Sequence, residues 1–170
     1  MVAAGGVSLV YDGDGNRVQE TVAGVVTRYL TGEVNPTGYV QVMAELSGTN
    51  QILRGYEWGL QLAAVRDFTV NSGGIFHYYG LDGHGSVRFL TSATGAVTDT
   101  YDYDAFGNLI ASTGTTVNNY LFAGEQFDPA LGILQPCPVV RPETENDLKH
   151  YIITRLIKIM MFFTCGVFLR

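Results

Sequence analysis

A six-residue phrase occurs twice in full in this chain and once in altered form. The phrase Tyr-Asp-x-x-Gly-Asn stands at residues 11–16 and again at 103–108, and the altered copy at 81–86 keeps the Asp and the Gly but has Leu in place of Tyr. Recurrence at spacings near twenty residues is typical of repeat architectures, in which each unit buries its apolar face only against its neighbours. The repeat therefore predicts a scaffold before it predicts an enzyme.

Each copy of the phrase has the composition of a tight turn between two strands. An Asp carboxylate can accept hydrogen bonds from the backbone two residues ahead, and a Gly tolerates positive φ. A Tyr before the turn can pack its ring against neighbouring hairpins while its hydroxyl stays in water. We expect the following residues to shape the turns and to do no chemistry: Tyr11, Asp12, Gly15, Asn16, Asp82, Gly85, Tyr103, Asp104, Gly107 and Asn108.

Short strand-like runs separated by clusters of Gly, Asp and Asn fill most of the chain. The 170 residues include 21 Gly and 10 Tyr, and only 15% of them are charged. This composition is typical of a β-rich protein with many turns. In one run, Val97, Asp99 and Tyr101 fall on the same face of a strand. The fold class predicted is mainly β, built of antiparallel hairpins, with a last strand at 119–123 and no amphipathic helix before residue 140.

The composition changes abruptly near residue 134. Thirteen of the sixteen acidic residues lie within residues 1–135, whereas both Cys, both Lys and three of the five Pro lie within residues 136–170. We therefore divide the chain into a core, residues 1–133, and a divergent tail, residues 134–170. A C-terminal helix is predicted in the tail.

The apolar run at 151–169 is about as long as a membrane span. Arg155 and Lys158 lie in its first half, and a cation near the centre of a membrane helix is costly. Insertion into a membrane, an interfacial helix and a tail without a native fold all stay open.

No arrangement of residues in the chain predicts catalysis or a cofactor. The segment 12–16 resembles a calcium loop, but an EF-hand needs Gly and Glu where this chain has Arg17 and Ala23. Asp102 and Asp104 are paired acids of the kind that can do acid–base work, yet no third group accompanies them. A net charge of −6 argues against nucleic-acid binding.

The remaining reactive side chains are scattered. His77, His84 and His150 do not have metal-ligand spacing, and neither Cys137 nor Cys165 has a CxxC partner. The two Cys could pair in an oxidising compartment, although their spacing does not require it. Ser86 lacks the closing Gly of a nucleophile elbow. We expect no catalytic, metal or cofactor site.

Four stretches of the chain together resemble the YD-repeat core of the Rhs (rearrangement hot spot) family. They lie at residues 29–42, 78–88, 100–107 and 122–129, and the resemblance covers about residues 8–133. It implies a large β-sheet shell whose hairpins wind into a hollow cocoon around a toxic C-terminal domain. The partners implied are other YD repeats and the enclosed toxin, and the location implied is secreted or at the cell surface.

The chain departs from the family pattern after Gly132. The closing strands and the residues associated with self-cleavage have no counterpart at Pro136 and beyond, so none is carried over; a frameshift or a recombined tail would explain the change. The first residues do not form a signal peptide, so the protein is either cytosolic or a fragment whose export signal lies upstream, and we expect the fragment. The predicted function is a non-catalytic structural piece of an Rhs-type shell that encapsulates or displays a C-terminal toxin or effector, in bacterial competition or in cell-surface interaction. The alternative is a core that carries a short membrane-active or toxic tail, residues 136–170.

Overall fold

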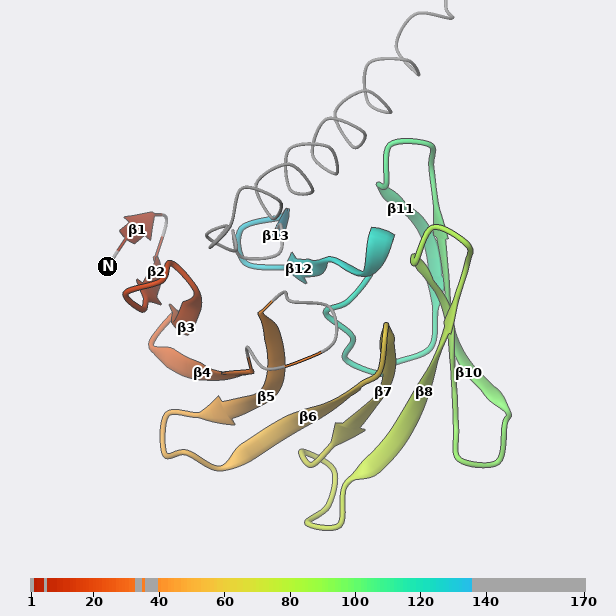
Figure 1. Ribbon diagram of the computed structural model, residues 1–170, viewed down its shortest axis with the longest axis horizontal. Coiled ribbons are helices and arrows are strands. Elements are labelled where there is room, and N and C mark those ends of the chain that lie inside the picture. The colour runs from red at the N-terminus through yellow and green to blue at the C-terminus, as the bar shows by residue number, and fades with distance from the viewer. Residues whose placement is uncertain (1, 5, 33–34, 36–39, 136–170) are drawn as a thin grey trace, which may run out of the picture. The chain divides into compact units, whose positions relative to one another are not determined.

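The computed structural model describes residues 2–4, 6–32, 35 and 40–135 (Figure 1). Eleven strands form one antiparallel sheet in which each strand pairs with those before and after it in the sequence, and two further strands form a separate pair. The elements are β1 (Val2–Ala4), β2 (Val7–Tyr11), β3 (Arg17–Val22), β4 (Val25–Gly32), β5 (Gln41–Ser47), β6 (Ile52–Trp58), β7 (Leu62–Asp67), β8 (Ile75–Leu81), β9 (Val87–Thr91), β10 (Val97–Tyr103), β11 (Leu109–Thr113), the short 3₁₀ helix η1 (Phe122–Gly124), β12 (Gln126–Asp128) and β13 (Ile133–Gln135). The predicted mainly-β, antiparallel fold is confirmed for the described residues. The predicted C-terminal helix falls within residues 136–170, outside them, and the division into core and tail stays a prediction.

The connections between strands alternate between the two ends of the sheet, because neighbouring strands run in opposite directions. The connections after β2, β8 and β10 contain turns that begin at Asp12, Asp82 and Asp104, and we call this end of the strands the Asp end. The connections after β5 and β9 contain turns that begin at Ser47 and Ser92, and we call the opposite end the Ser end. Three connections at the Asp end therefore share an Asp turn and two at the Ser end share a Ser turn, whereas the connection after β7 contains a turn that begins at Asn71.

One face of the sheet is buried by the chain itself. After β11 the chain turns back, and residues 114–128, which we call the return segment, run along this face toward β3 (Figure 1). The return segment and the strands form one apolar core, which consists of Tyr56, Leu62, Val65, Val87, Leu90, Tyr101, Tyr120 and Leu121. Full burial of one such side chain stabilises the fold by about 1.5–3 kcal/mol. Tyr120 and Leu121 therefore hold the return segment on the sheet.

The opposite face of the sheet carries aromatic side chains that remain open to solvent. Tyr78 and Phe89 are 43% and 40% exposed. Phe89 lies across Gly80 on the neighbouring strand, where a Cβ would come 2.2 Å from its ring. Only glycine therefore fits at position 80, because the ring of Phe89 occupies the place of a Cβ.

Two details of the predicted strands are wrong. Residues 119–123 do not form a strand. The carbonyl of Leu121 accepts a hydrogen bond from the N–H of Val87 (3.0 Å), and the chain then turns into η1, in which Ala123 has a φ of +54°. Val97 does not share the buried face with Asp99 and Tyr101. The register shifts between Val97 and Asp99, and Val97 is exposed.

Candidate functional site

The predicted turn residues form the same hydrogen-bonded turn at three places on the Asp end. In the first, Asp12 Oδ1 accepts hydrogen bonds from the backbone N–H groups of Asp14 (3.0 Å) and Asn16 (2.8 Å). Asp12 Oδ2 accepts a third from the side-chain amide of Asn16 (3.0 Å), and the N–H of Asp12 closes the turn on the Asn16 carbonyl (2.9 Å). Gly15 has a φ of +88°, which a residue with a Cβ adopts only under strain.

The turn at Asp104 has the same geometry. Asp104 Oδ1 accepts from the N–H groups of Phe106 (2.8 Å) and Asn108 (2.9 Å), and Oδ2 accepts from the Asn108 side chain (2.8 Å). Gly107 has a φ of +86°, and a Cβ on it would come 2.6 Å from the ring of Phe122. This turn therefore needs glycine for its backbone conformation and also for its contact with η1.

The turn at Asp82 keeps the carboxylate but changes its partners. Asp82 Oδ1 accepts from the N–H groups of His84 (2.9 Å) and Ser86 (3.0 Å), while Oδ2 accepts from Arg88 Nε (2.9 Å) in place of an asparagine. Ser86 is fully buried, and its hydroxyl oxygen accepts a hydrogen bond from the N–H of Ala123 (3.0 Å). Ser86 stands where the other two copies have Asn, and its side chain bonds to η1 and not to the Asp of its own turn.

Two turns at the Ser end use a hydroxyl where the others use a carboxylate. Ser47 Oγ accepts from the N–H groups of Thr49 (3.3 Å) and Gln51 (3.1 Å), and Ser92 Oγ accepts from the N–H of Thr94 (3.3 Å). The residue with positive φ is Asn50 in one turn and Gly95 in the other. Neither was predicted as a copy of the phrase, because it contains no Asp-x-x-Gly. The five turns are unevenly spaced along the sequence. The prediction that the turn recurs about every twenty residues is therefore wrong for the set as a whole.

The hydrogen bonds within the turns shift the pKa of each turn carboxyl in the same direction. The side chain of Asn108 is the largest cause at Asp104, and with the backbone N–H groups it lowers the pKa of that carboxyl. At Asp12 and Asp82, desolvation acts to raise the pKa, but the hydrogen bonds they accept outweigh it and the pKa of each is lowered. The ionised carboxylate is therefore the form that stabilises each turn.

The two tyrosines of the phrase have different surroundings. Tyr11 is exposed, but Tyr103 packs edge-on against Phe122 (5.6 Å between ring centroids) and lies under the guanidinium of Arg88 (5.4 Å). The hydroxyl of Tyr103 is buried and has no partner among the described residues, and desolvation raises the pKa of this phenol. The expectation that the hydroxyl stays in water is wrong for Tyr103, because that hydroxyl is buried.

Asp99 of β10 fixes the start of the return segment. Its carboxylate accepts hydrogen bonds from the N–H (2.9 Å) and hydroxyl (2.7 Å) of Thr116, and from the hydroxyl of Thr98 (2.6 Å). Asp99 is only 1% exposed. Desolvation acts to raise the pKa of Asp99, but these hydrogen bonds together lower it.

Glu45 of β5 fixes the middle of the return segment. Its carboxylate accepts hydrogen bonds from the hydroxyl of Tyr56 (2.7 Å) and the side-chain amide of Asn119 (3.3 Å), and it pairs with Arg54. Desolvation is the main cause that raises the pKa of Tyr56 well above its usual range, so the phenol stays protonated and keeps donating to Glu45. This buried charge is thus compensated from both the sheet and the return segment.

Asp128 fixes the far end of the return segment to β3. Its Oδ2 accepts from Arg17 Nη1 at 2.7 Å, and both side chains are buried although the residues are 111 positions apart. Gln126 accepts a second hydrogen bond from Arg17 (3.2 Å). Glu20 lies 3.6 Å from the same guanidinium and accepts from the hydroxyl of Tyr29 (2.7 Å). Desolvation, together with the charge of Asp128, raises the pKa of Glu20.

These three anchors, at Asp99, Glu45 and Asp128, were not predicted from the sequence. Each joins residues that are far apart along the chain, and no local pattern marks any of them. Each carboxylate is buried and accepts hydrogen bonds that the fold needs. The arrangement stabilises the return segment on the sheet.

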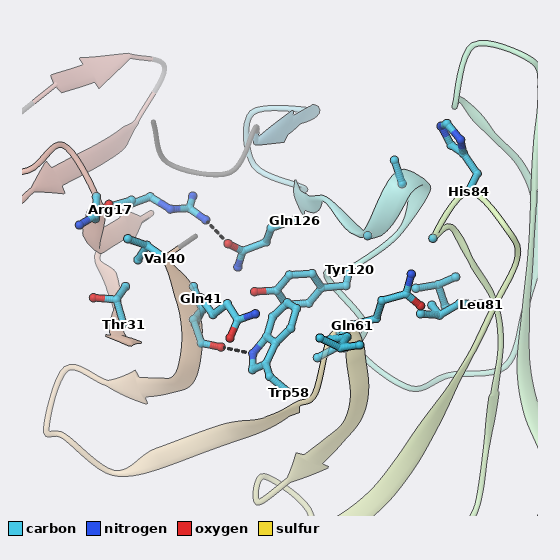
Figure 2. Close-up of a pocket in the computed structure, with 18 of the residues that line it drawn as sticks. Arg17, Thr31, Val40, Gln41, Trp58, Gln61, Leu81, His84, Tyr120 and Gln126 are labelled. Atoms are coloured by element: carbon cyan, nitrogen blue, oxygen red, sulfur yellow. Dashed lines mark hydrogen bonds between the residues drawn. The ribbon is translucent and has the colours of Figure 1, made fainter. Parts of the chain in front are cut away.

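A pocket of about 320 Å³ opens at the Asp end, between the return segment and the strand ends (Figure 2). Arg17 and His84 lie at its two sides in this view, with Trp58, Tyr120 and three glutamines between them. The indole N–H of Trp58 donates to the carbonyl of Val42 (2.8 Å). The residues that line the pocket are Tyr11, Gly15, Asn16, Arg17, Thr31, Val40, Gln41, Val42, Trp58, Leu60, Gln61, Leu62, Leu81, His84, Gly85, Val87, Tyr120, Ala123, Gly124 and Gln126.

No group of three or more His, Cys, Asp or Glu in residues 2–4, 6–32, 35 and 40–135 is placed to hold a metal ion. Within these same ranges no helix is both long and apolar enough to cross a membrane. The apolar run at 151–169 lies outside the described residues. The two acids of the pair considered above differ in their surroundings. Asp104 accepts the hydrogen bonds of its turn, whereas Asp102 is exposed on β10.

Comparison with known proteins relates the chain to large bacterial nucleases. The chain matches no protein-family model. It is 32% identical over 126 residues to the tRNA3(Ser)-specific nuclease WapA of Bacillus spizizenii, and equally to the tRNA(Glu)-specific nuclease WapA of Bacillus subtilis subsp. natto and the tRNA nuclease WapA of Bacillus subtilis strain 168. In each case the match covers 72% of this chain and 5% of the relative. The chain thus spans about a twentieth of the length of the nucleases it resembles.

Proposed function

We propose that the chain is a non-catalytic wall segment of an Rhs-type YD-repeat shell, which encloses a toxin or effector used in bacterial competition. The observation that carries the proposal is the repetition of one turn. Carboxylates or hydroxyls close the same turn five times along a single sheet, at Asp12, Ser47, Asp82, Ser92 and Asp104. A wall that is extended by adding like hairpins needs such a unit, whereas an enzyme does not.

The buried carboxylates support the non-catalytic part of the proposal. Asp99, Glu45 and Asp128 accept hydrogen bonds that hold the return segment in place. A general acid or base needs access to a substrate proton. Buried groups whose oxygens are already occupied by the fold are poor candidates for that role.

The relatives are called tRNA nucleases, but the match covers 5% of their length. We assign the cleavage of tRNA to other parts of those proteins and none of it to this chain. The net charge of −6 supports this assignment, since RNA binding relies on cationic side chains. The proposed partners are further YD repeats and an enclosed toxin, and the proposed location is secreted or at the cell surface.

The proposal can be tested by protease protection and by a nuclease assay. In the full-length protein that contains this chain, the enclosed polypeptide is expected to resist trypsin. Resistance should fall in the variant Asp99→Ala, which releases the return segment, and persist in Asp102→Ala, which changes an exposed side chain on the same strand. If the unsubstituted protein gives no protection, enclosure is wrong. If this purified chain cleaves tRNA, the non-catalytic role is wrong.

A further inference from the structure

The pocket at the Asp end is not accounted for by a purely structural role. Its volume of about 320 Å³ equals the space of roughly ten liquid water molecules, and it lies near the lower limit for small-ligand pockets. It is bounded by the ends of β5, β6 and β8 on one side and by the return segment on the other. A space of this size can hold one or two large side chains.

The floor of the pocket is apolar. Leu62 and Val87 from the core contribute to it, and so does Leu81. The indole N–H of Trp58 is already bonded to Val42, so the indole offers its ring surface to the pocket. An apolar group placed there would displace water from hydrocarbon and aromatic surface, which favours binding.

The pocket has no uncompensated charge to attract an ion. Arg17 is the one cation that is permanently charged among the described lining residues, and its guanidinium is paired with Asp128 at 2.7 Å. Asp and Glu are absent from that lining. A phosphate or a nucleic acid would find no free cation here, so the ligand that fits is neutral where it enters.

Three glutamines line the pocket around this floor: Gln41, Gln61 and Gln126. A side-chain amide can both donate and accept hydrogen bonds, and it therefore matches a peptide group. An apolar floor edged with amides suits an apolar side chain that is carried on a polypeptide backbone.

We propose that this pocket binds one large aliphatic side chain of an extended polypeptide, with Gln61 contacting the neighbouring peptide groups. The proposal deepens the shell function and rests on it, because it makes the polypeptide inside the shell the source of that side chain. Polypeptide is the expected occupant because relatives carry about twenty times the length matched here. The pocket would hold an enclosed chain at one point of the wall.

Trp58 makes the proposal directly testable, because it is the only tryptophan in the chain and it lines the pocket. The probe is the capped pentapeptide Gly-Gly-Leu-Gly-Gly, titrated into the protein while Trp58 emission is recorded. We expect a saturable change with a Kd on the order of 1 mM, as befits a single buried side chain. The control peptide Gly-Gly-Ser-Gly-Gly should bind at least about tenfold more weakly, because it lacks the apolar group.

Two matched variants locate the binding. Gln61→Phe puts a ring into the pocket, whereas Gln51→Phe makes the same change at an exposed glutamine in the Ser47 turn, at the opposite end of the sheet. We expect Gln61→Phe to weaken binding of the leucine peptide about tenfold and Gln51→Phe to leave it unchanged. Gln61→Ala, which keeps the pocket open but removes the amide, should weaken binding by about threefold.

Several results would overturn the proposal. These are no saturable change in Trp58 emission up to about 50 mM peptide, equal binding of the serine peptide, or equal binding by the two phenylalanine variants. Circular dichroism of each variant shows whether it is folded; if Gln61→Phe is not, the comparison of Gln61→Ala with the unsubstituted protein decides. Protease protection of the enclosed polypeptide is measured separately, so the shell function can hold even where the pocket binds nothing.

Discussion

Replacement of Asp99 by alanine should release the start of the return segment and destabilise the whole sheet. Asp99 is 1% exposed and accepts three hydrogen bonds, two of them from Thr116. In Asp99→Ala the partly buried N–H of Thr116 loses its acceptor, and a donor that stays buried without a partner costs about 1–3 kcal/mol. The space vacated by the carboxylate adds to the loss, because Gly114 packs so closely that a Cβ on it would lie 2.1 Å from Asp99 Oδ1.

We expect the free energy of unfolding to fall by about 3 kcal/mol, a large part of the 5–15 kcal/mol that is typical of a domain. The assay is urea denaturation at pH 7, followed by circular dichroism and by the emission of Trp58. The control is Asp102→Ala, which removes an exposed carboxylate from the same strand and should change the free energy of unfolding by no more than about 0.5 kcal/mol. If the two variants lose the same stability, the return segment is not anchored through Asp99.

Four further predictions follow from the turns, the carboxylates and the tail. Gly107→Val should lower the free energy of unfolding by at least about 2 kcal/mol, because Gly107 has a φ of +86° and faces Phe122. The control Gly83→Val changes a turn position with open space and no positive φ, and it should cost under about 1 kcal/mol. Equal melting temperatures of the two variants would show that the turn at Gly107 tolerates a side chain. Stability should fall as the pH is lowered below about 4, because folding lowers the pKa of four carboxyl groups from 3.8: Asp12, Asp82, Asp99 and Asp104. Their contribution to stability is present above pH 3.8 and is lost as the pH falls through the pKa values of the folded state. Urea midpoints that stay constant from pH 6 to pH 3 would contradict this. The pH dependence of the contribution from Glu20 has the opposite sign, because folding raises its pKa above 4.5 and its contribution to stability is lost as the pH rises through the pKa of the folded state. The stability of Glu20→Gln relative to the unsubstituted protein should therefore increase with pH above 4.5. A stability difference that is independent of pH would refute the assignment. Expression of residues 136–170 alone in bacteria should not arrest growth, and arrest or membrane leakage would favour the alternative of a toxic tail.

The turns could be predicted from the sequence because their interactions are local. Asp12 and Asp104 bond to groups two and four residues ahead, so the full pattern lies within one six-residue phrase. Ser47 and Ser92 make equivalent turns, but their likeness to the phrase was missed because each has Ser in place of Asp. A search for Asp or Ser followed three residues later by Gly or Asn would have found all five turns.

The anchors of the return segment could not be predicted in this way. Arg17 and Asp128 are 111 residues apart, and Glu45 and Asn119 are 74 apart. In each pair one group is placed by the register of a strand and the other by the path of the return segment. Long-range contacts also explain the error at 119–123, where a β-like sequence bonds to Val87 and Ser86 through Leu121 and Ala123 rather than as a strand.

Amide hydrogen exchange of the native protein tests most directly whether the return segment is part of the core. The amides to follow are those of Thr116 and Ala123, which donate to Asp99 and Ser86, and the amide of Val87, which donates to Leu121. If these contacts hold the fold together, all three should exchange only on global unfolding, as slowly as the central strands β6 and β9. Exchange of the three amides within seconds, while β6 and β9 remain protected, would show that the sheet folds without the return segment and would contradict the account.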